Sequence, residues 1–181
     1  MAKYEDQNAK EPATAEEVLA MHKILRSDPN RYLKIVSGWI DQNPNNANAY
    51  YERHMGWMRI GEPHRALADL DRAIELGVDP VTYLCRGKVH RHLGRYQDAL
   101  DDFQRGEALD PKEWNEDSFG PLYQADTHAR LGHESEALAY CARLPDTFWT
   151  PGLDGAPSGN KQEVAAALQV IAAQARSSPA S

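Results

Sequence analysis

The sequence has few of the features that mark secreted, membrane or β-sheet proteins. Its 181 residues include two cysteines, Cys85 and Cys141, which we expect to be small reduced core residues and not a disulfide. No apolar run approaches the length of a membrane span. Met1–Asp6 has no apolar stretch behind its charge, so we expect no signal peptide and a cytoplasmic protein. No segment alternates apolar and polar residues long enough to predict a sheet.

Patterns typical of catalysis and metal binding are also missing. The sequence has no glycine-rich phosphate loop and no nucleophile elbow. None of its seven histidines is paired at i, i+4 beside a third ligand, as a metal site would require. The acidic pairs Asp69/Asp71 and Asp101–Asp102 are expected on solvated helix faces, where no dry cleft would separate their pKa values. We therefore predict no catalytic residue, no metal site, no cofactor and no enzymatic activity.

The charge balance disfavours nucleic acid as a partner. The chain carries 27 acidic against 20 basic residues, a formal net charge of −7, whereas binding to phosphates needs a broad basic surface. Hydrophobic residues make up 41% of the chain, which is enough to bury one core, so we expect a single domain.

The chain does contain a sequence pattern that occurs three times. It runs from Gly61 to Leu70, from Gly94 to Phe103 and from Gly132 to Cys141. In each copy an alanine follows the glycine by five residues, and the next packing residue follows the alanine by four. These alanines are Ala66, Ala99 and Ala137, so the intervals are 33 (99 − 66) and 38 (137 − 99) residues. Self-similarity at such a period predicts a stacked helical repeat.

This spacing resembles the tetratricopeptide repeat (TPR) family, whose 34-residue unit is a pair of antiparallel helices. The first-helix packing positions are Tyr50, Arg53, His54, Trp57; Tyr83, Arg86, Gly87, His90; and Pro121, Gln124, Ala125, His128. The second-helix positions are Ala66, Leu70, Ala73; Ala99, Phe103, Gly106; and Ala137, Cys141, Leu144. Arg53, Arg86 and Gln124 replace the usual leucine, His90 and His128 stand in for packing aromatics, and about four residues are inserted near Trp114.

The resemblance implies an all-α fold, a right-handed solenoid of antiparallel helix pairs. We expect three clear units, a degenerate N-terminal unit and a C-terminal capping helix. The expected segments are a flexible tail at 1–12, the repeat array at 13–144, a Pro/Gly loop at 145–160, the capping helix at 161–176 and a tail at 177–181.

Local signals support this division. Thr14 with Glu17 forms a capping-box pattern, and Pro29 follows Asp28 as the first residue of a second helix. In the last helix Val164, Leu168 and Ile171 form one apolar stripe, which should cover the exposed face of the final repeat.

The resemblance implies that the groove residues lie on the first helix of each unit. The first of them follows the first packing aromatic by one place, and the other two stand four and eight places after it. These positions hold Tyr51, Met55 and Arg59; Leu84, Lys88 and His92; and Leu122, Asp126 and Arg130, and Arg91 adjoins them. The set has several bases in an acidic chain. We therefore expect it to bind another protein or peptide with an acidic or carboxylate-bearing segment, and Arg59, Lys88, Arg91 and Arg130 to converge on it.

Several functions stay open from the sequence. The chain is expected to be a non-enzymatic protein-binding module that contacts neither nucleic acid nor membrane. A dedicated secretion or effector chaperone, and an immunity protein that neutralises a basic toxin, are alternatives within this class. Homo-oligomerisation is open, and the Phe148–Trp149 loop or the outer helix face could replace the groove as the binding surface.

Overall fold

The computed structural model describes residues 14–77, 79–116, 119–152 and 154–177. These residues are almost entirely helical, apart from a hairpin of two-residue strands, so the all-α prediction is confirmed. The chain divides into two compact units, Met1–Val78 and Asp79–Ser181, instead of the expected single domain. The reason is that a repeat buries its apolar surface against its neighbours and needs no common core.

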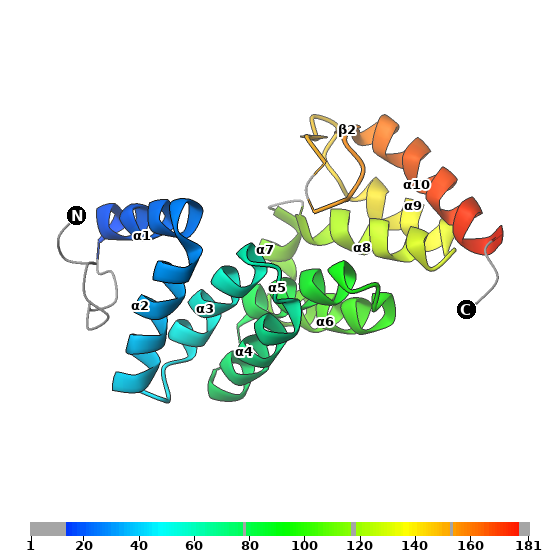
Figure 1. Ribbon diagram of the computed structural model, residues 1–181. Helices are drawn as coiled ribbons and strands as arrows, with labels where there is room; N and C mark the ends of the chain where they lie inside the picture. Colours follow the sequence, from blue (N-terminus) through cyan, green and yellow to red (C-terminus); the bar gives the residue numbers. More distant parts are fainter. Residues whose placement is uncertain (1–13, 78, 117–118, 153, 178–181) are drawn as a thin grey trace. The chain divides into compact units, whose positions relative to one another are not determined.

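The first unit contains two helical pairs (Figure 1). Its helices are α1 (Ala15–Ser27), α2 (Pro29–Gln42), α3 (Ala47–Arg59) and α4 (Pro63–Leu76). The predicted capping box closes the start of α1, because Thr14 accepts from the Glu17 amide and Glu17 accepts from the Thr14 amide, both at 3.2 Å. Asp28 accepts from the Arg31 amide at 3.0 Å and Pro29 opens α2. The core of this unit gathers Met21, Tyr32, Ile35, Val36, Trp39, Ile40 and Ala49.

The second unit contains the remaining elements. They are α5 (Pro80–His92), α6 (Tyr96–Leu109), α7 (Pro111–Glu116), α8 (Phe119–Arg130), α9 (Glu134–Ala142), β1 (Trp149–Thr150), β2 (Gly159–Asn160) and α10 (Lys161–Ser177). Its core includes Phe103, Trp114, Leu122, Tyr123, Cys141, Leu144, Val164 and Leu168. Cys141 is buried and Cys85 half-buried, and both are thiols.

The glycine that begins each copy of the repeated pattern allows a backbone conformation that the turn requires. Gly61, Gly94 and Gly132 have φ angles of +78°, +73° and +80°, in the left-handed region that favours glycine. Each ends the turn that joins the first helix of a pair to the second. The alanines that follow, Ala66, Ala99 and Ala137, are fully buried, as the resemblance implied.

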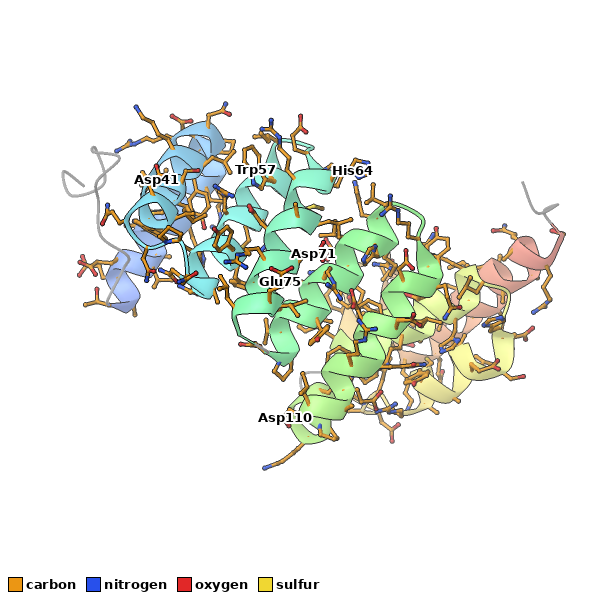
Figure 2. All side chains as sticks on the ribbon, turned by 90° about the horizontal axis from the view of Figure 1, so that it is seen from below. Asp41, Trp57, His64, Asp71, Glu75 and Asp110 are labelled. Carbon is orange, nitrogen blue, oxygen red and sulfur yellow. The ribbon has the colours of Figure 1, made fainter. Side chains whose placement is uncertain are left out.

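Ion pairs join the two helices of a pair at equivalent positions. Arg53 binds Asp69 through Nη2 to Oδ1 at 2.7 Å and Nε to Oδ2 at 2.8 Å. Arg86 binds Asp102 in the same way at 2.6 and 2.8 Å. The prediction that Asp69 and Asp102 are solvated is therefore wrong, because their side chains are only 6% and 3% exposed. Asp71 is exposed on α4 (Figure 2).

The insertion near Trp114 forms helix α7. The Trp114 indole is buried and donates to Gln124 Oε1 at 2.9 Å, and Gln124 donates to Glu107 Oε2 at 2.9 Å. Gly106 and Gly120 leave room for the ring, since a Cβ at either position would overlap it. The ring therefore fills a space that two glycines provide, and the insertion becomes part of the core.

Helix α10 packs on α8 and α9 at the end of the second unit (Figure 1). Val164 and Leu168 of the predicted stripe are fully buried, and Ile171 packs against them half-buried. Asn160 accepts from the Glu163 amide at 3.1 Å and caps the start of the helix. The predicted tail at 1–12 and residues 178–181 of the predicted C-terminal tail lie outside the described residues.

Candidate functional site

Helices α5 and α8 bring cationic and aromatic side chains together in the second unit. Lys88 and Arg91 lie one turn apart on α5, and Tyr123, Asp126 and Arg130 lie on one side of α8 at i, i+3 and i+7. We call these five residues the cationic cluster. The Lys88 ammonium and the Arg91 guanidinium lie 5.2 and 5.1 Å from the centre of the Tyr123 ring, within the range of cation–π attraction.

A buried carboxylate organises the two guanidinium groups. Asp126 Oδ2 accepts from Arg91 Nε and from Arg130 Nε, both at 2.8 Å, and Arg91 Nη2 lies 2.7 Å from the same oxygen. The Asp126 side chain is 0% exposed and that of Arg91 3% exposed. Asp126 Oδ1 is buried and accepts no hydrogen bond from the residues that the structure describes. Charged groups buried in this way are held in place by their partners, so Asp126 fixes the direction in which both arginines point.

The remaining donors of the cluster hold a segment of the loop between β1 and β2. Lys88 Nζ and the Tyr123 hydroxyl both bind Asp154 Oδ2 at 2.8 Å. Arg91 Nη2 donates to the main-chain oxygen of Asp154 at 3.1 Å, and Arg130 Nη2 donates to that of Gly155 at 2.7 Å. In Figure 1 this orange loop extends toward α8. One side-chain carboxylate and two consecutive carbonyls are thus bound by four side chains.

The pKa values reflect these contacts. Partial burial alone would raise the pKa of Asp154, but the hydrogen bond and positive charge of Lys88, with smaller contributions from Tyr123 and Arg91, lower it overall. Burial, followed by the hydrogen bond to Asp154, raises the pKa of Tyr123. Asp154 therefore stays ionised and Tyr123 stays a hydroxyl donor at neutral pH.

The predicted groove residues fall into three groups. On α5 and α8, Lys88, Arg91, Asp126 and Arg130 meet in the cationic cluster. Leu122 is fully buried in the core, Leu84 packs half-buried against that core, and His92 is exposed at the end of α5. In the first unit, Tyr51 and Met55 are half-buried and Arg59 is exposed on α3.

Sequence reasoning missed Tyr123, Asp154 and Gly155. Tyr123 follows Leu122, and the family spacing pointed to Leu122 instead. The Asp-Gly dipeptide at 154–155 is a turn signal, which predicted a loop, but nothing in the sequence indicated that the loop lies against α5 and α8. Among the described residues there is no group of three or more His, Cys, Asp or Glu placed to hold a metal ion.

The family model of the tetratricopeptide repeat matches residues 80–113, which contain helices α5 and α6. The chain contains a tetratricopeptide repeat. The repeat unit that the model matches includes Lys88 and Arg91, and the fold is that of protein–protein interaction modules. Among the described residues, no helix is both long and apolar enough to cross a membrane.

Curated relatives resemble part of this TPR chain. DnaJ homolog subfamily C member 3 from Rattus norvegicus is 36% identical over 94 residues, which are 51% of this chain and 19% of that protein. Tetratricopeptide repeat protein 6 from Homo sapiens is 30% identical over 73 residues, 40% of this chain and 14% of that protein. The chain spans at most about a fifth of these curated relatives.

Solved structures share the fold over most of the TPR chain. MamA superposes with a TM-score of 0.63 at 18% identity, covering 86% of this chain and 92% of MamA. YrrB, described as a TPR protein with an unusual peptide-binding site, superposes with a TM-score of 0.64 at 18% identity, covering 90% of this chain and 77% of YrrB. At these identities the likeness concerns the fold.

Proposed function

We propose that this protein is a non-enzymatic module that binds a partner polypeptide on the first helices of its repeats, with the cationic cluster as the main contact. The supporting observation is that this cluster holds a stretch of polypeptide, Asp154–Gly155, by its carboxylate and its carbonyls. These are the groups that an acidic segment of a partner would present. Charge-assisted hydrogen bonds of this kind are among the stronger polar contacts in proteins.

The roles within the site follow from burial. Lys88 is 34% exposed and can contact a partner directly. Arg91 and Asp126 are buried and fix the geometry, and Arg130, 28% exposed, offers Nη2 beyond its bond to Asp126. In the first unit Tyr51, Met55 and Arg59 are the equivalent candidates on α3. A fold relative, YrrB, is described as having a peptide-binding site, which is consistent with peptide binding here.

The experiment is a selection of peptides from a random phage-displayed library on the immobilised full chain. The module should enrich peptides that share an acidic residue, and these should bind with affinities that fall as salt is raised. The variant Lys88→Glu should lose the selected peptides, because like charges placed opposite one another cost several kcal/mol in binding. Lys34→Glu, an exposed lysine on α2, is the control with the same change of charge and should keep them.

Two results would contradict the proposal. One is a selection that enriches no peptide family on the folded chain. The other is a set of enriched peptides that bind Lys88→Glu as tightly as the wild type. In the second case Trp149, which is 67% exposed in β1, becomes the better candidate, and Trp149→Ala would then be the variant that abolishes binding.

A further inference from the structure

The segment bound by the cationic cluster has an unusual backbone. Asp154 has a φ of +51° and Gly155 a φ of +77°. Left-handed conformations at two consecutive residues are those of a type I′ turn, in which Asp-Gly is a favoured pair. Asp154 is the one non-glycine with positive φ in the described part of the chain. The cluster therefore binds a turn of defined shape as well as a negative charge.

The two sides of this contact differ in how firmly they are held. Arg91 and Asp126 are buried and their geometry is fixed within the helices. Asp154, in contrast, is 51% exposed, and its ion pair with Lys88 is open to water. Exposed ion pairs contribute little to stability and are screened by salt. The receiving site is thus preformed, and Asp154–Gly155 fills it through exchangeable polar contacts, whereas the next residue, Ala156, is 7% exposed and packs in the core.

We propose that the four donors Lys88, Arg91, Tyr123 and Arg130 form a recognition site for an aspartyl-glycyl turn, and that Asp154–Gly155 is its internal occupant. A partner binds by presenting the same turn and displacing the chain's own copy. This rests on the proposed function and specifies it, because it names the ligand as an Asp-Gly turn and assigns the β1–β2 loop the role of competitor.

The strength of the competition between the tethered Asp154–Gly155 turn and an external peptide can be estimated. A tethered competitor acts at an effective concentration on the order of millimolar for a short linker. An external peptide with the same turn must exceed this concentration to displace the tethered copy, so at lower concentrations it is excluded until the tethered carboxylate is removed. The affinity for such a peptide should therefore rise when Asp154 loses its charge.

The test uses a fluorescent peptide with the sequence of residues 150–158, Thr-Pro-Gly-Leu-Asp-Gly-Ala-Pro-Ser, blocked at both ends so that its aspartate is its only carboxylate. Fluorescence anisotropy measures its binding to the full chain. The variant Asp154→Asn should bind it at least about tenfold more tightly than the wild type. The double variant Asp154→Asn/Lys88→Met should lose this gain, and a peptide with asparagine in place of aspartate should bind at least about tenfold more weakly.

A second variant keeps the test valid if Asp154→Asn is poorly folded by circular dichroism. Gly155→Ala leaves the carboxylate in place but disfavours the positive φ of the turn, so it should also strengthen binding of the peptide. Equal affinities for wild type and both variants, or equal binding of the aspartate and asparagine peptides, would overturn the proposal. If the phage-selected peptides still bind in that case, the proposed function stands and only the Asp-Gly assignment fails.

Discussion

Arg86 and Asp102 form a bidentate ion pair that reproduces, 33 residues later, the pair of Arg53 and Asp69. In both repeats the arginine occupies the position where the family usually has leucine, and the aspartate faces it from the second helix. The third repeat has Gln124 at the arginine position, and there the partners are Trp114 and Glu107. The helix pairs are therefore joined by polar contacts at a position that is normally apolar.

The first prediction concerns this ion pair. Arg86→Leu restores the usual residue but leaves Asp102, whose side chain is 3% exposed, without its bidentate partner. Loss of one partner of a buried pair should lower the free energy of unfolding by about 3 kcal/mol. Urea unfolding measures this. Arg105→Leu is the control, because Arg105 lies 3.8 Å from the same Asp102 but is 59% exposed, and its loss should change stability by less than about 0.5 kcal/mol. Equal effects of the two variants would mean that the bidentate pair is not important for stability.

A second prediction concerns the space around Trp114. Gly120→Ala places a methyl group where the indole lies, and overpacking of this kind should cost about 1–3 kcal/mol. Gly77→Ala is the matched control, since its Cβ would meet only Ala47 Cβ at 3.9 Å, an ordinary contact. Thermal unfolding followed by circular dichroism compares the two. A melting temperature unchanged by Gly120→Ala would show that the ring can move aside.

The third prediction concerns helix α10. Leu168 is fully buried against the last repeat, so Leu168→Ala should destabilise the second unit by about 2–5 kcal/mol. Val170, on the same helix, is 56% exposed, and Val170→Ala should change stability by less than about 0.5 kcal/mol.

Deletion of residues 160–181 should expose the apolar surface that α10 covers and cause aggregation, measured by light scattering. A truncated chain that stayed monomeric with its original melting temperature would contradict the capping role.

The fourth prediction is a pH dependence that involves His128. Burial, and then the charge of His133, lower the pKa of His128, while Glu136 opposes the shift. The buried Nδ1 of His128 has no hydrogen-bond partner among the described residues. The unfolded chain then binds the proton more readily, so stability is complete above the ordinary pKa of about 6.5 and falls as pH drops toward the folded value. His128→Phe keeps a ring beside Tyr140 and should flatten the decline between about pH 7 and pH 5. Urea unfolding across this range measures it, and parallel curves for variant and wild type would refute it.

The fold could be predicted because its signals are local and repeated. Gly61, Gly94 and Gly132 mark the turns by their φ angles, and Ala66 and Ala99 mark the tight helix contacts by their size. The structural role of each of these residues is determined within its own turn or helix. Such signals survive in a single sequence because they depend on neighbours only a few residues away.

The candidate site could be predicted only in part. Lys88 and Arg130 were found by their position in the repeat, but their partner Asp154–Gly155 lies in a loop 66 (154 − 88) and 25 (155 − 130) residues away in sequence. Asp102 was expected in water because charge runs usually stay solvated; its burial depends on the facing arginine. Contacts between distant residues follow from tertiary packing, which periodicity does not encode.

Trp149 gives the molecule an optical reporter of its own. It stands five residues before Asp154 in the sequence and its side chain is 67% exposed, whereas Trp39 and Trp114 are 3% and 5% exposed in the cores of the two units. An aqueous quencher such as iodide should reach the indole at 149 most readily, reach Trp57, half-buried on α3, to a lesser extent, and leave Trp39 and Trp114 emitting. Departure of the loop from α5 and α8 would change the quenching of Trp149, so occupancy of the site could be followed by light emission in the unlabelled protein.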